Sequence, residues 1–137
     1  MSIMENSRFS NRRSNGLAKK AGLEPDVWWE VMKGGAADSF VLHHDVPSIF
    51  AGHYDPSFRV ELALKDLDLI QELIKEHNTR AELTNSAHER FKEAKERYGD
   101  EAGEMTVCKL IEEDGKVNLQ VDGDWIAPWE VKHPNDK

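Results

Sequence analysis

The sequence has very little cysteine and no long apolar run. Its 137 residues include one cysteine, Cys108, which excludes an internal disulfide and suits a reducing cytosol. No stretch approaches the roughly 20 apolar residues that span a bilayer, and residues 1–16 contain no apolar signal-peptide core. These absences favour a cytoplasmic protein without a membrane partner.

Motifs for catalysis and metal binding are also missing. The chain has no HExxH, CxxC or EF-hand pattern, no GxSxG and no phosphate-binding GxGxxG. His43, His44 and His53 are the nearest approach to a ligand set, but adjacent histidines on a helix point about 100° apart and do not converge. We therefore predict no metal site, and a small metal or anion binder built on this segment is the weakest alternative.

The balance of charge is acidic. A net charge of −8 argues against nucleic acid as the main partner. Hydrophobic residues make up 39% of the chain and charged residues 32%, which fits one soluble globular domain with a real core. Residues 1–16 differ from the rest, because they form a polar, basic leader without an apolar stripe.

Apolar periodicity and helix-boundary residues predict an all-α domain of about six helices. Residues 17–22 resemble the end of a helix. Proline at position 25 suits a helix start, and the helix that follows is expected to bury Val27, Trp28, Val31 and Met32, with Trp29 to one side. Further helices are predicted at 40–50, 58–78 and 103–113. Between the last two, capping boxes at 79–82 and 86–89 introduce another helix that runs to Tyr98. Its expected inward residues are Leu83, Ala87, Phe91 and Ala94.

The last part of the chain, residues 114–137, has a different pattern. Val117, Leu119 and Val121 alternate before an Asp122–Gly123 turn, and residues 125–131 could return as a second strand. The pattern allows a small C-terminal β-hairpin, which Trp125 and Trp129 would pack onto the domain.

The segment 58–78 has the clearest helical period. Its apolar residues share one broad arc, which comprises Leu62, Ala63, Leu67, Leu69, Ile70, Leu73 and Ile74. Asp66 falls near the middle of this arc and Lys65 at its edge. A carboxylate in a core is costly unless it is paired, so we expect Asp66 to meet a partner. One alternative is a structural contact, in which an oppositely charged side chain or the N-terminus of a neighbouring helix binds Asp66. The other is that the helix borders a polar site at which Lys65 and Asp66 act.

Three motifs in register resemble the C-terminal domain of the β-hydroxyacid dehydrogenases, the relatives of 3-hydroxyisobutyrate and 6-phosphogluconate dehydrogenases. They are LAKKAGLxP at 17–25, GGAxxS at 34–39, and Phe58 followed by LKDLxL at 64–69. The similarity covers roughly residues 17–113. Residues 114–137 extend beyond the family pattern.

The resemblance implies an all-α domain that normally follows a Rossmann domain and a long interdomain helix. In this family a hydride passes between a substrate hydroxyl carbon and NAD or NADP in the cleft between the domains. The resemblance places Phe58, Lys65 and Asp66 at the cofactor, and Lys65 and Ser39 at the substrate. It also implies a homodimer formed through the helical domain.

The catalytic lysine of the family would fall just upstream of Met1, so we expect no catalytic residue in this chain. No Rossmann domain precedes the match, and isolated activity is therefore not expected. A Rossmann-domain partner chain would have to supply the missing half. The alternative is a non-catalytic dimerisation or binding module derived from the same fold.

Overall fold

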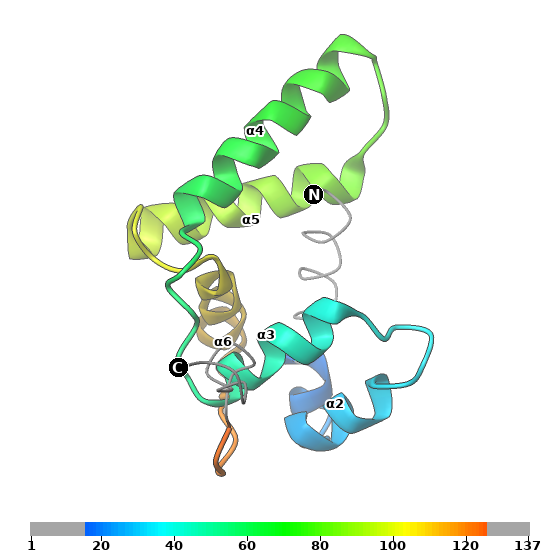
Figure 1. The fold of residues 1–137 in the computed structure, drawn as a ribbon, viewed down its shortest axis with the longest axis vertical. Coiled ribbons are helices and arrows are strands. Elements are labelled where there is room, and N and C mark those ends of the chain that lie inside the picture. The colour runs from blue at the N-terminus through cyan, green and yellow to red at the C-terminus, as the bar shows by residue number, and fades with distance from the viewer. Residues whose placement is uncertain (1–15, 126–137) are drawn as a thin grey trace, which may run out of the picture.

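The computed structural model describes residues 16–125, and these residues form an all-α domain (Figure 1). Residues 16–20 are helical. The elements that follow are α2 (Pro25–Met32), α3 (Phe40–Phe50), α4 (Val60–Glu76), α5 (Glu82–Tyr98), the 3₁₀ turn η1 (Glu104–Thr106) and α6 (Val107–Gly115). No strand occurs in this part of the chain. The all-α prediction is therefore confirmed.

The helices α4 and α5 form a long hairpin that projects from the rest of the domain (Figure 1). The hairpin is held to α6 by a continuous apolar cluster. This cluster contains Val60, Ala63, Leu64, Leu67, Phe91, Ala94, Val107 and Leu110, all of them buried. One side of α4 is thus fixed by packing against α5.

The other end of the domain consists of α2, α3 and residues 117–125 (Figure 1). Trp28, Leu42, Val46 and Phe50 form its buried centre. A smaller cluster joins this end to α6 through Ile49, Tyr54, Met105, Cys108 and Leu119. Cys108 is fully buried, as a small apolar residue would be.

Two details of the helix predictions are wrong. In α2 only Trp28 of the expected buried set lies in the core, and Val31 is 72% exposed. Trp29 instead makes edge-to-face contacts with Phe50 and Trp125. The distant aromatic partners, rather than the pattern within α2, decide which side of the helix faces inward.

The start of α5 also differs from the prediction. The helix begins at Glu82 with Ala81 as its N-cap, and no side chain caps it. Neither predicted capping box forms, and Leu83 is exposed. The later apolar positions Ala87, Phe91 and Ala94 are buried as expected, and Phe91 and Ala94 belong to the cluster shared with α4 and α6.

The predicted C-terminal β-hairpin is not seen in residues 117–125, the part of it that the structure describes. Residues 117–121 form no strand, although Leu119 is buried. The backbone N–H of Leu119 donates to the Glu112 carboxylate and that of Val121 to the Phe50 carbonyl. The helical core therefore satisfies the donors that a return strand would have paired. Residues 126–131 and Trp129 lie outside the described residues.

Candidate functional site

The apolar arc of α4 divides into two faces. Val60, Ala63, Leu64 and Leu67 are buried against the hairpin core. On the other side Leu62, Leu69 and Leu73 are exposed, the last two by 52% and 53%. We call Leu62, Asp66, Leu69 and Leu73 the outer face of α4, since their spacing places them along one side of the helix. Only part of the predicted arc therefore enters the core.

Asp66 belongs to this outer face. Its side chain is half-buried, and none of the residues 16–125 forms an ion pair or hydrogen bond with it. Solvent can still reach the carboxylate, so the cost that required a partner in a closed core is avoided. The structure therefore leaves Asp66 as an acceptor surrounded by leucine side chains on a surface.

Lys65 is exposed and lines a groove between α4 and α5. The groove has a volume of about 980 Å³. Its α5 side carries His88, Lys92 and Lys95. Lys92 lies 3.4 Å from Glu89, and Lys95 lies 3.4 Å from Asp100. No described residue pairs with the Lys65 ammonium, so this cation is available to a ligand or a partner.

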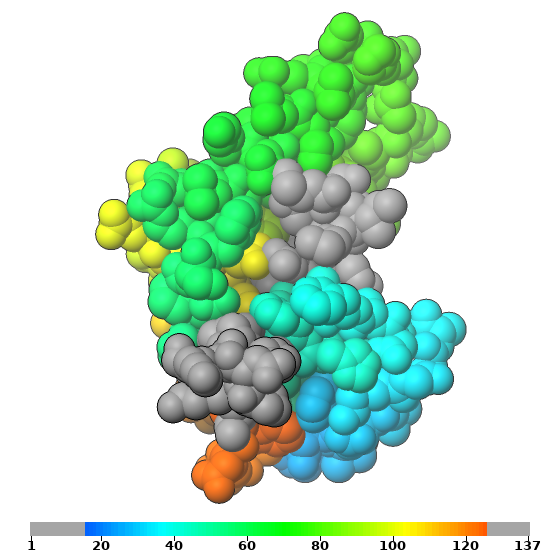
Figure 2. Space-filling view, in the orientation of Figure 1, coloured from blue at the N-terminus to red at the C-terminus, as the bar shows by residue number. Residues whose placement is uncertain are grey.

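A contact between His88 and Asp68 crosses the groove. The Nε2 atom of His88 lies 2.7 Å from a carboxylate oxygen of Asp68, and the His88 side chain is largely buried. Nearer the hairpin tip, the Gln71 amide donates to Asn85 over 2.9 Å. These contacts help to fix the spacing of the two helices. Figure 2 shows the hairpin at the surface of one face of the molecule.

Phe58 lies just before α4 and is 37% exposed. Its backbone is fixed by η1, because the Glu104 N–H donates to the Phe58 carbonyl over 2.8 Å. Two residues on, the Val60 N–H donates to the Ala102 carbonyl over 2.7 Å. The chain thus holds an aromatic ring near the start of the helix that carries Lys65 and Asp66.

Ser39 is separate from these residues. It is the N-cap of α3, and its Oγ accepts a hydrogen bond from the Leu42 N–H over 3.2 Å. The helices α3 and α4 do not pack against each other in any extended contact. The described residues therefore place Lys65 and Asp66 on α4 and Phe58 just before it, and leave Ser39 at another helix.

In the loop before α3, the Asp38 carboxylate is bound by groups of the loop and of α3. The Gly34 N–H donates to Asp38 over 3.1 Å, and His43 Nε2 lies 2.6 Å from the other Asp38 oxygen. The hydrogen bond from Gly34, followed by His43, lowers the pKa of Asp38 below its usual value. The Gly34 N–H of this loop is thus already used by an internal carboxylate.

The histidine-rich segment is likewise engaged within the chain. His44 stacks on Phe40 with ring centroids 5.0 Å apart and lies 3.0 Å from Asp45. Within residues 16–125, no three His, Cys, Asp or Glu side chains converge as a metal-ligand set. Nor is any helix in this range long and apolar enough to cross a membrane.

Residues 16–111 match the sequence profile of the family described as the NAD-binding domain of NADP-dependent 3-hydroxyisobutyrate dehydrogenase. The chain belongs to this family. The match contains α2 to α5, η1 and the first half of α6, and therefore the whole groove and the outer face of α4. The family resemblance that the motifs indicated is confirmed at this level.

Curated relatives of this dehydrogenase-family chain include two L-threonate dehydrogenases. The protein from Haemophilus influenzae is 31% identical over 96 residues, which are 69% of this chain and 32% of the relative. The protein from Cupriavidus necator is 28% identical over 75 residues, 55% of this chain and 25% of the relative. The chain thus spans about a third or less of the curated relatives it matches.

Two solved structures share the fold. A 3-hydroxyisobutyrate dehydrogenase from Salmonella typhimurium superimposes with a TM-score of 0.72 at 22% identity, over 80% of this chain and 39% of that one. A 3-hydroxyisobutyrate dehydrogenase from Mycobacterium tuberculosis with L-serine superimposes with a TM-score of 0.73 at 19% identity, over 80% of this chain and 40% of that one. At these identities the likeness establishes the fold of the dehydrogenase-family domain.

The motifs did not indicate the α5 side of the groove. His88, Lys92 and Lys95 follow one another at helical steps of four and three residues, which place them on one side of α5. This spacing was a usable signal. What the sequence could not provide is the pairing of that side with Lys65 of α4, which depends on how the two helices pack.

Proposed function

We propose that this chain is the cofactor- and substrate-cleft domain of a 3-hydroxyisobutyrate dehydrogenase-like oxidoreductase. In this proposal the domain also mediates dimerisation and is inactive by itself. The observation that carries the proposal is that the exposed Lys65 and the half-buried Asp66 lie on α4 within the matched family region and have no partner among the described residues. The single cysteine fits a cytoplasmic location.

The α4 residues fit one wall of a dinucleotide site. Lys65 offers three N–H donors, Asp66 offers a carboxylate acceptor, and Phe58 offers a partly exposed ring for apolar contact. Lys65 would bind a ribose or phosphate oxygen, and Phe58 would exclude water from one side of the ring system. The bound NAD or NADP would supply hydride transfer.

The roles of these residues concern binding and orientation. Lys65 would contact both the cofactor and the substrate, whereas Asp66 would fix the cofactor. Ser39 would reach substrate only through an element that brings the α3 N-terminus towards α4. A Rossmann-domain partner chain is the proposed source of the opposite wall and of the proton-transferring lysine.

Titration of NADH and NADPH into the purified chain tests the cofactor role. We expect weak binding that Lys65→Ala abolishes and Lys75→Ala leaves unchanged. Lys75 is the matched control, because it is exposed on the same helix but lies outside the groove. Failure of both cofactors to bind at millimolar concentration would remove the role for the isolated chain.

Reconstitution tests the catalytic role. A family Rossmann half with its interdomain helix, added in trans, should restore turnover that the chain alone lacks. Lys65→Ala should abolish the restored activity and Lys75→Ala should retain it. Restored activity that is indifferent to Lys65→Ala would contradict the assignment.

A non-catalytic dimerisation module is the second candidate, and the outer face of α4 favours it. Leu62, Leu69 and Leu73 form an exposed apolar stripe, and such stripes commonly mark protein–protein contacts. If two copies pair there, Leu69→Glu with Leu73→Glu should convert a dimer into a monomer in analytical ultracentrifugation. Val27→Glu with Val31→Glu, on the exposed side of α2, is the control. A dimer that survives the α4 change would exclude this interface.

A further inference from the structure

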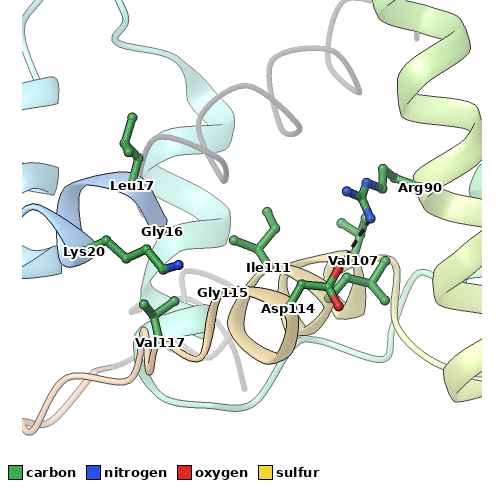
Figure 3. Close-up of a pocket in the computed structure, with 10 residues that line it drawn as sticks. Gly16, Leu17, Lys20, Arg90, Val107, Ile111, Asp114, Gly115 and Val117 are labelled. Carbon is green, nitrogen blue, oxygen red and sulfur yellow. Dashed lines mark ion pairs between the residues drawn. The ribbon is translucent and has the colours of Figure 1, made fainter.

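A second cavity lies away from the α4 groove, between residues 16–20, α5 and α6 (Figure 3). Its volume is about 340 Å³, at the lower end of the range for small-molecule sites. The walls are largely apolar and include Leu17, Val107, Leu110, Ile111 and Val117. Such walls favour a ligand with a compact hydrocarbon body.

The polar groups of the cavity are placed around these walls. Lys20 extends towards α6, and its Cε lies 3.7 Å from the position of a Cβ at Gly115 (Figure 3). Arg90 and Asp114 lie across the cavity from Lys20, as an ion pair of 3.5 Å (Figure 3).

The charges favour an anionic ligand. Asp114 already interacts with Arg97 over 3.2 Å in addition to Arg90. No described residue pairs with Lys20. Arg90 Nη1 lies 2.7 Å from Glu93 and 3.5 Å from Asp114, and the guanidinium retains further N–H donors for a ligand oxygen. The unsatisfied polar capacity of the cavity is therefore cationic.

We propose that this cavity binds a small amphipathic monocarboxylate, a free organic acid with a hydrocarbon body of about six to ten carbons. The hydrocarbon lies against Leu17, Ile111 and Val117. The carboxylate accepts hydrogen bonds from Lys20 and from Arg90. The site is independent of the proposed cofactor groove, since none of its lining residues belongs to α4.

Octanoate is the probe, and the full chain is the target. Isothermal titration should give a dissociation constant on the order of 1 mM. Octanol and octylammonium, which match the hydrocarbon but not the charge, should bind at least about fivefold more weakly. Backbone amide NMR shifts should concentrate at Leu17, Ile111 and Gly115.

Four variants test the residue roles. Lys20→Met keeps the length of the side chain and should weaken octanoate binding about fivefold. Lys19→Met is its matched control, because Lys19 pairs with Glu24 over 2.6 Å and does not line the cavity. Leu17→Trp should abolish binding by filling the space. Leu17 is 71% exposed, so this change should leave the fold intact.

Asp114→Asn gives the sharpest test. Removal of its charge takes a repelling carboxylate out of the cavity, while Arg90 keeps its 2.7 Å pair with Glu93. Octanoate should therefore bind about two- to threefold more tightly, although α5 and α6 lose an ion pair. Absence of octanoate binding would overturn the proposal. So would equal binding of octanol, or binding that Lys20→Met and Leu17→Trp leave unchanged.

Discussion

The hydroxyl of Tyr54 donates a hydrogen bond to the carboxylate of Glu112, 58 residues further along the chain. The other carboxylate oxygen of Glu112 accepts from the Leu119 N–H over 2.8 Å. One side chain of α6 thus joins the loop before α4 to the segment after α6. Burial, followed by the Glu112 carboxylate, raises the pKa of Tyr54 above its usual value.

Removal of the Glu112 carboxylate should therefore destabilise the domain more than removal of the Tyr54 hydroxyl that donates to it. Glu112→Ala leaves a buried hydroxyl and the Leu119 N–H without their acceptor, and should lower the free energy of unfolding by about 2–3 kcal/mol. Tyr54→Phe removes the hydroxyl itself and should cost about 1 kcal/mol. Urea denaturation measures both.

Glu76→Ala is the control for this pair, because Glu76 is exposed at the end of α4 and has no partner among the described residues. Its effect should stay within about 0.5 kcal/mol of zero. Equal effects of Glu76→Ala and Glu112→Ala would contradict the bridging role of Glu112.

The two tyrosines of the chain should resist ionisation in the folded state. Burial, and then the neighbouring Glu113 carboxylate, raises the pKa of Tyr98 to about 12. A raised folded pKa favours the neutral phenol, so its stabilising effect is complete below the unfolded value near 10 and is lost as pH rises through 12. Absorbance at about 295 nm, at a pH near 10.5, should show little tyrosinate in the native chain.

Unfolded chain in urea at the same pH is the reference, and there both phenols should be more than half ionised. Tyr98→Phe should remove the first native titration step and leave Tyr54 protonated. Native tyrosinate equal to that of the unfolded chain would show that neither phenol is protected.

The sequence predicted the helices well because apolar period and boundary residues act locally. It could not show which half of the α4 arc is covered, since Ala63 and Leu67 are buried in a cluster with residues of α5 and α6. The same holds for Trp29, whose neighbour Trp125 lies 96 residues away.

The candidate site divides in the same way. Lys65 and Asp66 could be chosen from a motif and from the helical period. Lys65 is exposed in the groove, whereas Asp66 is half-buried on the outer face. The cavity around Lys20 had no sequence signal, because its walls come from residues 16–20, α5 and α6. The alternation at 117–121 predicted a strand, but Glu112 and the Phe50 carbonyl bind that segment to a helical core.

The aromatic cluster at the α2–α3 end should depend on Trp125. Its ring centroid lies 4.9 Å from that of Phe50 and 5.5 Å from that of Trp29, both edge-to-face. Trp125→Ala should lower the free energy of unfolding by about 1–3 kcal/mol and shift the Trp29 fluorescence towards that of solvent-exposed indole. Val31→Ala, on the exposed side of α2, should do neither. No stability loss in Trp125→Ala would exclude a packing role for Trp125.

Gly103 should be the residue least tolerant of a methyl group. A Cβ there would lie 2.2 Å from the Asp55 carbonyl oxygen and 2.4 Å from that of Tyr54, and both neighbours are backbone atoms that cannot rotate away. Gly103→Ala must therefore displace the loop or η1, which holds the Phe58 backbone. We expect a loss of about 3 kcal/mol in the free energy of unfolding, together with weaker NADH binding.

At Gly35 the same methyl would meet only ordinary contacts, the nearest at 3.5 Å, so Gly35→Ala is the matched control. A Gly103→Ala chain as stable as Gly35→Ala would mean that the loop and η1 can separate without cost.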